Sequence, residues 1–571
     1  MSQCRCWSVE DCVPTLGGGS APGHGFVFST CDLSHRSVLS TPIWLHYLLE
    51  GVEAMTVSEI TGNTSVAEVV KRCPNARRVF DRHGLKGCGG EHGPSERLAF
   101  FAAVHQANLE ELLREINAEM ENPSGVYVYK ETLQDYIYRR FFKVGIATVL
   151  SVGCLWGAIN LLQIALGKSF LQLRLLSSIH AHAHAMIFGW VAMFVMGFAY
   201  QSFPRFKNTT LWRPELANLS FYLLAAGIVA GMAADMLLPA TASFLLGALS
   251  GVSEISSVGI FMFVLYRTAR QSIEPHNPYE KFIASSFLWL LLGTILESVF
   301  FFAKATAHFE HDLIMRIALI DGPLRDIQLL GFAALIIGGV SQRFVPQVYG
   351  LARPERDHQG LIFWLMNGSL VLNIISYVLL LTTRKLYFAI GLEAAHFLMP
   401  VWAVLLARQI GVFGKPSQPD RTFKFVRAAY VWLLISCGMM PFFPLYGALT
   451  HQVFAHTYMG SHRHAFTVGF ISMMILGVSS RVVPILAGID AKRMNSLWVP
   501  FVLFNVGCTG RVLLQVLTDF VPGVAYPLLG FTGFIELTAL LWWGTELWRT
   551  MNVGRTNRAQ LLPAPFPLAA G

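Results

Sequence analysis

The stretch at residues 184–190, His-Ala-Met-Ile-Phe-Gly-Trp, decides the fold because its pattern returns twice. The counterparts are Asp-Ile-Gln-Leu-Leu-Gly-Phe at 326–332 and His-Ala-Phe-Thr-Val-Gly-Phe at 464–470. In each copy a second Gly follows the first by 8 residues, and a Pro follows it by 15. The first Gly residues are 142 and then 138 positions apart. Matched spacing over such a period indicates three related units.

Other positions keep the same register. Asn367 and Asn505 each lie 36 residues after the first Gly of their copy. Glu254, Ala395 and Glu536 lie 65, 64 and 67 residues after theirs, and His396 stands beside Ala395. Each unit has room for four membrane helices, so the units are expected to run parallel around an axis along the membrane normal.

Composition places the chain in a membrane. Of its 571 residues, 54% are hydrophobic and 14% are charged, and the mean hydropathy is +0.49. A soluble globular protein of this length is far less apolar. The net charge of +8 comes from Lys and Arg clusters that flank apolar runs. This pattern is typical of membrane topology and excludes a nucleic-acid partner.

About twelve apolar runs are long enough to cross a hydrocarbon core of ~30 Å. We predict an all-α polytopic bundle with spans near 142–166, 178–203, 214–238, 242–267, 282–304, 320–343, 360–382, 388–408, 426–448, 463–486, 497–518 and 525–549. The sixth is the least regular, because Asp321, Arg325 and Asp326 stand at its start.

Basic residues set the orientation. They cluster before the first span and in the loops after even-numbered spans, whereas the loops after spans three and eleven have none. The positive-inside rule then places both termini in the cytoplasm, and spans two, six and ten begin on the outer side of a cytoplasmic (inner) membrane.

The chain divides into five predicted segments. Residues 1–54 are Gly-, Ser- and Pro-punctuated, and we expect them to be disordered or to lie upstream of a start at Met55. Residues 55–121 predict a small cytoplasmic helical domain, in which Thr64 caps a helix over 66–70 and residues 98–121 form one amphipathic stretch. A linker at 122–139 precedes the membrane domain at 140–550, and 551–571 form a cytoplasmic tail.

Five histidines lie at the outer ends of two of the units: His180, His182 and His184 in one, His462 and His464 in the other. Neutral imidazoles on facing helices ligate haem iron or copper. Residues two apart on a helix are turned by ~200°, so His462 and His464 would serve two sites. His184 and His464 share one register position and are predicted to face each other. The alternative is that the histidines are interfacial and bond to outer loops.

Five more ionisable residues lie within predicted spans: Glu254, Glu297, Glu393, His396 and Glu536. Burying such groups in a membrane is costly, so they are candidates for a proton relay. Bonds to neighbouring helices are the alternative.

The segments 182–189, 324–346 and 464–484 resemble the NnrS family, bacterial membrane proteins associated with the response to nitric oxide. The resemblance covers roughly residues 140–550. It implies a twelve-span protein with haem and copper that protects cells from nitric oxide and related metabolites.

The architecture is also similar to subunit I of haem-copper oxidases and nitric oxide reductases, which implies an oxidoreductase supplied by quinol or cytochrome c. Carried over, His464 with His184 would match the low-spin haem pair, and His462 would match the high-spin haem ligand. The chain departs from that pattern, since span six has no intramembrane His and span seven lacks a His-His pair. The copper site of an active oxidase is therefore not visible.

The N-terminal domain has a resemblance of its own. Residues 69–74, 79–84 and Cys88-Gly-Gly90 resemble the small helical domain of ScdA-type iron-sulfur cluster repair proteins. A Cys beside two Gly residues is expected at an exposed turn, where Cys88 serves as a redox thiol or as a structural residue.

Three functions follow from these patterns. The first is a haem- or copper-containing protein of the nitric-oxide response. The second is a transporter or exporter of a metal ion or small molecule, whose outer histidines capture the ion. The third is a sensor that signals membrane redox state through Cys88. An optical spectrum separates the first from the second.

Overall fold

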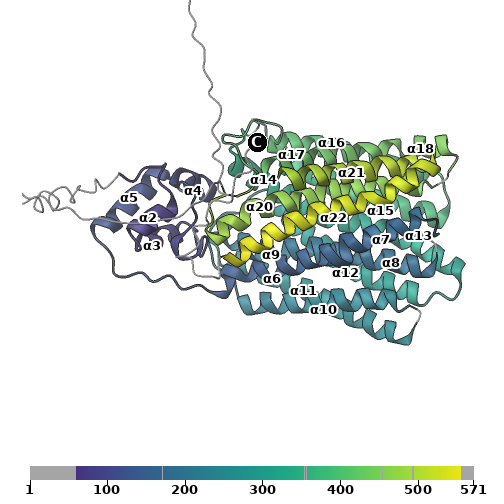
Figure 1. Cartoon of the computed structure of the whole chain (residues 1–571), viewed down its shortest axis with the longest axis horizontal. Helices are drawn as coiled ribbons and strands as arrows, with labels where there is room; N and C mark the ends of the chain where they lie inside the picture. Colours follow the sequence, from purple (N-terminus) through teal and green to yellow (C-terminus); the bar gives the residue numbers. More distant parts are fainter. Residues whose placement is uncertain are drawn as a thin grey trace, which may run out of the picture. The chain divides into compact units, whose positions relative to one another are not determined.

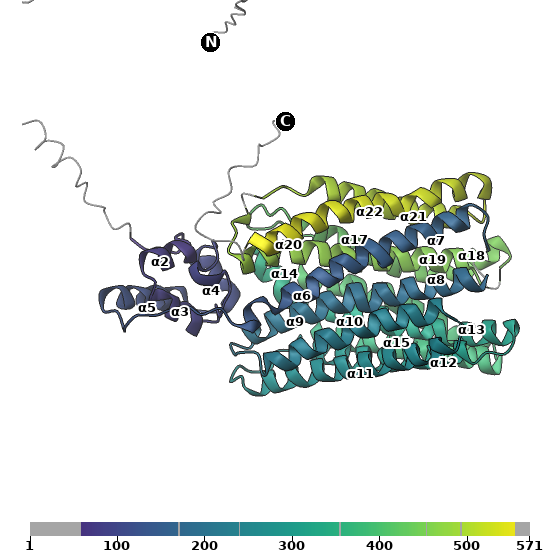
Figure 2. The ribbon, with the colours of Figure 1, turned by 60° about the horizontal axis from the view of Figure 1, so that its bottom comes forward.

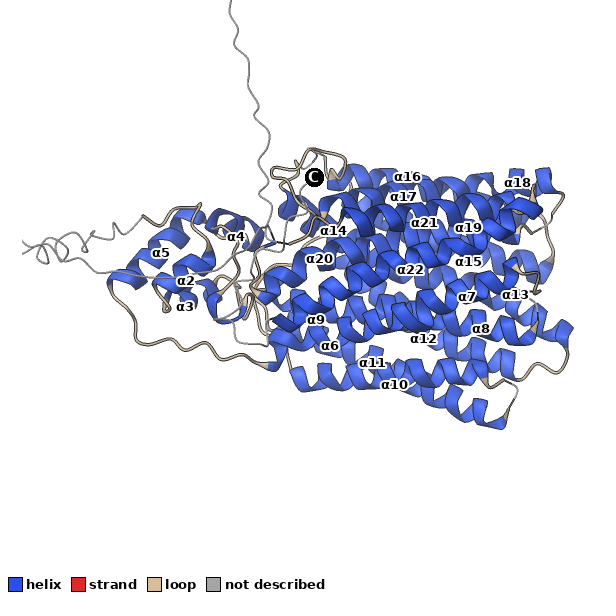
Figure 3. Ribbon diagram, in the orientation of Figure 1, coloured by secondary structure: helices blue, strands red, loops and turns tan. Residues whose placement is uncertain are grey.

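The structure is a computed structural model that describes residues 59–169, 172–238, 240–352, 354, 356–452, 454–491 and 494–553. The predictions for residues 1–54 lie outside this range, as does most of the predicted tail at 551–571. The described part is helical, and its only β-type pairing is an isolated bridge between Ser65 and Arg97 (Figure 3).

The helices follow one another along the chain with short connections. Their bounds are α2 Val66–Arg72, α3 Ala76–Arg82, α4 Leu98–His105, α5 Leu109–Glu121, α6 Leu133–Thr148, α7 Cys154–Ala165, α8 Leu173–His184, α9 Met193–Phe206, α10 Pro214–Met236, α11 Thr241–Arg270, α12 Glu280–Ala305, α13 Glu310–Asp326, α14 Leu335–Tyr349, α15 Gln359–Thr383, α16 Tyr387–Ile410, α17 Phe423–Met439, α18 Phe443–Thr450, α19 His456–His464, α20 Met473–Ala487, α21 Trp498–Leu517 and α22 Pro522–Val553.

Within the described residues, twelve helical segments are long and apolar enough to cross a membrane, and from α6 onward they run side by side (Figures 1 and 2). They are Leu133–Ala165, Arg174–Phe206, Pro214–Met236, Thr241–Arg270, Glu280–Ala305, Glu310–Tyr349, Gln359–Thr383, Tyr387–Ile410, Phe423–Thr450, His456–Ala487, Trp498–Leu517 and Pro522–Val553. The all-α polytopic prediction is confirmed. The irregular sixth segment is the most buried of the twelve, which explains how its charged residues are accommodated.

Helices α2–α5 form the small N-terminal domain, and its helix ends differ in detail from the prediction. Ser65, not Thr64, caps α2, because its side chain accepts a hydrogen bond from the backbone N–H of Glu68. The stretch 98–121 is two helices, since Gln106 has a left-handed backbone and Asn108 caps α5. A side-chain cap of this kind satisfies backbone donors that the new helix leaves open.

The three matched sequence segments share a local structure. Each contains an eight-residue π-helical stretch that begins directly after residue 184, 326 or 464: η3 Ala185–Ala192, η4 Ile327–Ala334 and η6 Ala465–Ser472. π-helical turns are rare and occur mostly at functional sites. The three matched segments therefore share a π-helical stretch at the same register position.

The shared glycines explain the matched spacing. A Cβ placed on Gly197, Gly339 or Gly477 would lie 2.7, 2.7 and 2.9 Å from the Cβ of a Phe on the preceding membrane segment, namely Phe141, Phe282 and Phe425. The first Gly of each segment is equally tight, against Thr148, Trp289 and Trp432. Small residues allow membrane helices to approach this closely.

Candidate functional site

His184, at the end of α8, lies between two carboxylates. Its Nε2 is 2.9 Å from Glu254 Oε1 of α11, and its Nδ1 is 3.9 Å from Glu297 Oε1 of α12. Arg325 of α13 donates to the other oxygen of Glu297 at 3.0 Å. All four side chains are buried. We call His184, Glu254, Glu297 and Arg325 the carboxylate–histidine cluster.

This arrangement differs from the predicted pairing of His184 with His464. His184 Nε2 lies beside Glu254, and its Nδ1 lies beyond hydrogen-bond distance of Glu297, so the nearest polar groups of this ring are carboxylates and not His464. His184 and His464 occupy one register position in their segments. That position does not reveal that Glu254 and Glu297 lie beside His184.

His464 instead lies near His182. The two rings are within electrostatic range of each other, and Arg511 of α21 lies near both. His182 Nδ1 is 2.9 Å from the carbonyl oxygen of Gly153, and His464 Nδ1 is 2.9 Å from that of Gly460. We call this the His182–His464 site.

The backbone partners fix the tautomer of both rings. A carbonyl oxygen only accepts hydrogen bonds, so each Nδ1 must carry the proton and each Nε2 keeps its lone pair. Histidines that ligate metals usually have their other ring nitrogen held in this way. His182 and His464 therefore have the electronic form that a metal requires.

Unsatisfied polar atoms lie close to this site. Glu536 of α22 is buried, and its Oε1 has no hydrogen-bond partner among the described residues. Arg511 Nη1 is also buried without a partner. Each such atom costs free energy unless a ligand or water satisfies it. Arg511 and Glu536 lie within electrostatic range of each other, and among the described residues each keeps one buried polar atom without a hydrogen-bond partner.

His462 belongs to a second imidazole pair. Its Nδ1 is 3.0 Å from the carbonyl oxygen of Ser436 on α17, and it lies within electrostatic range of His396. His396 Nδ1 is 3.2 Å from Glu393 Oε2 on the same helix, α16. His462 and His464 thus have different neighbours, in line with the ~200° between residues two apart on a helix. We call this the His396–His462 site.

The fifth histidine has a different environment. His180 is buried, and its ring makes an edge-on contact with Phe300 at 5.3 Å between centroids. Lys304, a turn further along α12, pairs with Asp235 of α10 at 2.5 Å. Lys304, Arg325, Asp235 and Asp321 all lie within electrostatic range of His180, so cations and carboxylates both act on its ring.

The candidate relay residues lie in three places. Glu254 and Glu297 belong to the carboxylate–histidine cluster, Glu393 and His396 to the His396–His462 site, and Glu536 to the surroundings of Arg511. Ion pairs extend the first group outward, because Arg325 also contacts Asp321 at 3.1 Å and Asp321 contacts Arg463 at 3.2 Å.

Cys88 is buried, contrary to the expected exposed thiol. The turn that carries it packs against the end of α20, where Cys88 Sγ is 3.9 Å from the carbonyl oxygen of Ile485. Burial raises the pKa of the Cys88 thiol, and the nearby guanidinium groups of Arg205 and Arg77 offset this only in part. The thiol is therefore held in its protonated form.

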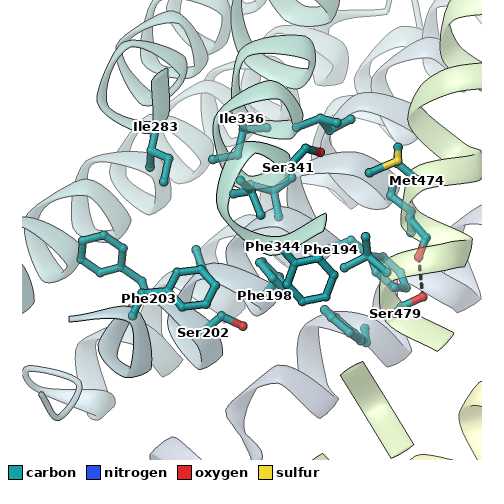
Figure 4. A pocket seen from close by; sticks show the side chains of 18 of the residues that line it. Phe194, Phe198, Ser202, Phe203, Ile283, Ile336, Ser341, Phe344, Met474 and Ser479 are labelled. Atoms are coloured by element: carbon teal, nitrogen blue, oxygen red, sulfur yellow. Dashed lines mark hydrogen bonds between the residues drawn. The ribbon is translucent and has the colours of Figure 1, made fainter. Parts of the chain in front are cut away.

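An apolar cavity lies among α9, α14 and α20 (Figure 4). Its free volume is about 100 Å³. The three helices contribute the same register positions, namely five, six, nine and ten residues after the first shared Gly: Phe194, Ile336 and Met474; Val195, Ile337 and Ile475; Phe198, Val340 and Val478; Ala199, Ser341 and Ser479. Such a space suits a small uncharged molecule.

The sequence of the membrane part matches one protein family. Residues 133–552 match the NnrS protein family. The chain belongs to this family. The match begins and ends with the twelve membrane helices. No curated protein matches the chain.

Sequence reasoning overlooked several residues of this NnrS chain's sites. Arg511 and the pair Asp235 and Lys304 lie within apolar helices. Charged residues are rare inside membrane helices, so that rarity was a usable signal. The backbone carbonyls of Gly153 and Ser436 left no trace in the sequence, because any residue supplies a carbonyl.

Proposed function

We propose that this NnrS protein binds haem through His182 and His464 and acts at the membrane in the response to nitric oxide. The observation that carries the proposal is the fixed tautomer of the two imidazoles, whose Nδ1 atoms donate to backbone carbonyls. Each Nε2 is thereby ready to bind a metal. When bound, a haem supplies a redox-active iron that interacts with nitric oxide.

The donor set favours haem over an ion held by protein groups alone. Among the described residues no group of three or more His, Cys, Asp and Glu side chains is placed to hold a metal ion. A haem needs only one or two axial ligands from the protein. Paired imidazoles are sufficient for it.

The protein's own groups have distinct roles in this proposal. The Arg511 guanidinium would neutralise a carboxylate on the ligand, and Glu536 would accept a proton or a hydrogen bond. The His396–His462 site is the place for a second redox centre, haem or copper. Here Glu393 would orient His396 as a carboxylate orients a metal-binding imidazole.

The remaining parts of the proposal concern arrangement and location. We infer three four-helix repeats around one axis, because the π-helical stretches, the close-packed glycines and the cavity lining all follow one register. The protein would lie in the bacterial inner membrane with both termini in the cytoplasm. Quinol or cytochrome c is the proposed electron donor.

The test is cofactor content followed by function. The full-length protein is expressed with haem precursor and copper supplied, purified in detergent, and assayed for both. We expect at least one haem per chain. A null strain complemented with this gene should also outgrow the uncomplemented strain under nitric oxide. Protein purified with neither cofactor would contradict the redox proposal and favour transport.

A further inference from the structure

A second cavity lies where the small domain meets the membrane helices, which belong to one compact unit. Its free volume is about 120 Å³. The small domain contributes Cys88, Glu96 and His105, and the ends of α9, α14 and α20 contribute one arginine each: Arg205, Arg343 and Arg481. Three arginines therefore line the cavity, and Glu96 is the one carboxylate among its lining residues.

Arg481 lies closer to its carboxylate partners than Arg205 does. Arg481 Nη1 pairs with Glu96 Oε1 at 2.8 Å, and its Nε lies 3.1 Å from Asp420 Oδ2. Arg205 donates to the carbonyl oxygen of Lys86 at 2.6 Å, but its nearest carboxylate oxygen, on Asp135, is 4.0 Å away. Arg481 is thus neutralised, while Arg205 is neutralised weakly.

Arg343 is the decisive residue. It is buried at 7% exposure, and it donates to neutral groups, the Tyr279 hydroxyl at 2.7 Å and the carbonyl oxygen of Phe206 at 3.4 Å. Its Nε has no hydrogen-bond partner, and among the described residues no carboxylate pairs with it. A buried charge without a counter-charge is strongly unfavourable.

The nearby histidine, His105, adds no charge to the cavity. Burial, together with the charges of Arg205 and Arg343, lowers the pKa of His105 to about 3, so the ring is neutral at physiological pH. The Cys88 thiol is protonated as well, because burial raises its pKa. His105 and Cys88 thus contribute no negative charge that could offset the guanidinium of Arg343.

We propose that this cavity binds a small inorganic oxyanion, held by Arg343 and Arg205. A guanidinium presents parallel N–H donors that match two oxygens of one anion. A free volume of this size holds several water molecules. A planar or tetrahedral oxyanion is small enough to fit it. The proposal is independent of haem binding at the other end of the helices.

Equilibrium dialysis of the full-length protein in detergent tests the site, with inorganic phosphate in one arm and nitrate in the other. We expect saturable binding of at least one of them at about one ion per chain, competed by the other oxyanion more strongly than by chloride. Arg343→Gln should weaken binding about tenfold or more, because it removes the charge that the anion offsets. Arg343→Lys keeps the charge and should retain part of the affinity.

The matched control is Arg408→Gln, which removes an exposed arginine and should bind as the wild type does. Size-exclusion chromatography and helicity confirm folding, and Arg205→Gln replaces Arg343→Gln as the decisive variant if the latter fails to fold. Absence of saturable binding in both arms would overturn the proposal. Wild-type affinity in a folded variant that lacks the Arg343 or Arg205 charge would overturn it as well.

Discussion

At the scale of single residues, the sites are distinguished by what each His ring nitrogen faces. Nδ1 of His182, His462 and His464 lies at a backbone carbonyl oxygen, whereas the nitrogens of His184 lie 2.9 Å and 3.9 Å from carboxylate oxygens. Residue types alone do not separate these cases. The sequence indicated which histidines to examine, and the helix packing decided their chemistry.

Cys88 should react slowly with alkylating reagents. It is buried and its pKa is raised, so little thiolate is present at neutral pH. Cys73 in the same domain is partly exposed and serves as the matched site. Site-resolved mass spectrometry after N-ethylmaleimide treatment should show Cys88 labelled about tenfold more slowly than Cys73. Equal rates would show that the turn is open in solution.

His105 should make the small domain sensitive to acid. Its pKa is about 3 in the folded protein, below its ordinary value of 6.5, because of burial and the charges of Arg205 and Arg343. As the pH falls below 6.5 the unfolded segment binds the proton and the folded one does not, so stability is lost. Hydrogen exchange in α4, corrected for intrinsic rates, should show local opening rise by up to about tenfold per pH unit.

The control for this effect is a pair of substitutions. His105→Gln should flatten the pH dependence of exchange in α4, and His92→Gln, at an exposed position, should leave it unchanged. A pH dependence that survives His105→Gln would assign the effect to another group.

At the scale of elements, the matched glycines are contact points between helices. Gly477→Ala would place a Cβ 2.9 Å from the Cβ of Phe425, and such overpacking typically costs about 1–3 kcal/mol. Gly368 of α15 has open space around its Cβ position, and there Ala should be neutral or stabilising. Thermal unfolding in detergent should lower the midpoint for Gly477→Ala only. Equal midpoints would contradict the close packing.

The number of membrane helices and several of their contact points were predictable from the sequence. Hydropathy alone gave twelve spans, and the Gly and Pro spacing marked the helices that pack most tightly. The π-helical stretches were not predictable, since they change the backbone hydrogen-bond pattern without changing composition. The break at Gln106 and Asn108 was missed because neither Gly nor Pro marks it, although Asn is a common helix-cap residue.

At the scale of the whole molecule, three sites occupy the junctions between groups of helices. Two of them contain two histidines within electrostatic range of each other, and the third contains the carboxylate–histidine cluster. The predicted symmetry identified equivalent positions but not their partners, since Gly231, Asn373 and Arg511 occupy one register position with different chemistry. Matched register positions thus carry side chains of different chemistry.

Topology is a prediction at the same scale. Basic loops follow the even-numbered spans, so both termini should be cytoplasmic. Green fluorescent protein fused at the C-terminus should fluoresce, and alkaline phosphatase fused there should be inactive because it folds only after export. An active phosphatase fusion would invert the topology and move every His site to the other side of the membrane.

The central claim is that His182 and His464 hold one haem, and the optical spectrum of matched variants tests it most directly. His182→Ala and His464→Ala should each abolish the same low-spin component, while His184→Gln should keep it, because His184 faces Glu254 and Glu297. Size-exclusion chromatography confirms that each variant is folded. Loss of the component in His184→Gln, with His182→Ala unchanged, would contradict the account.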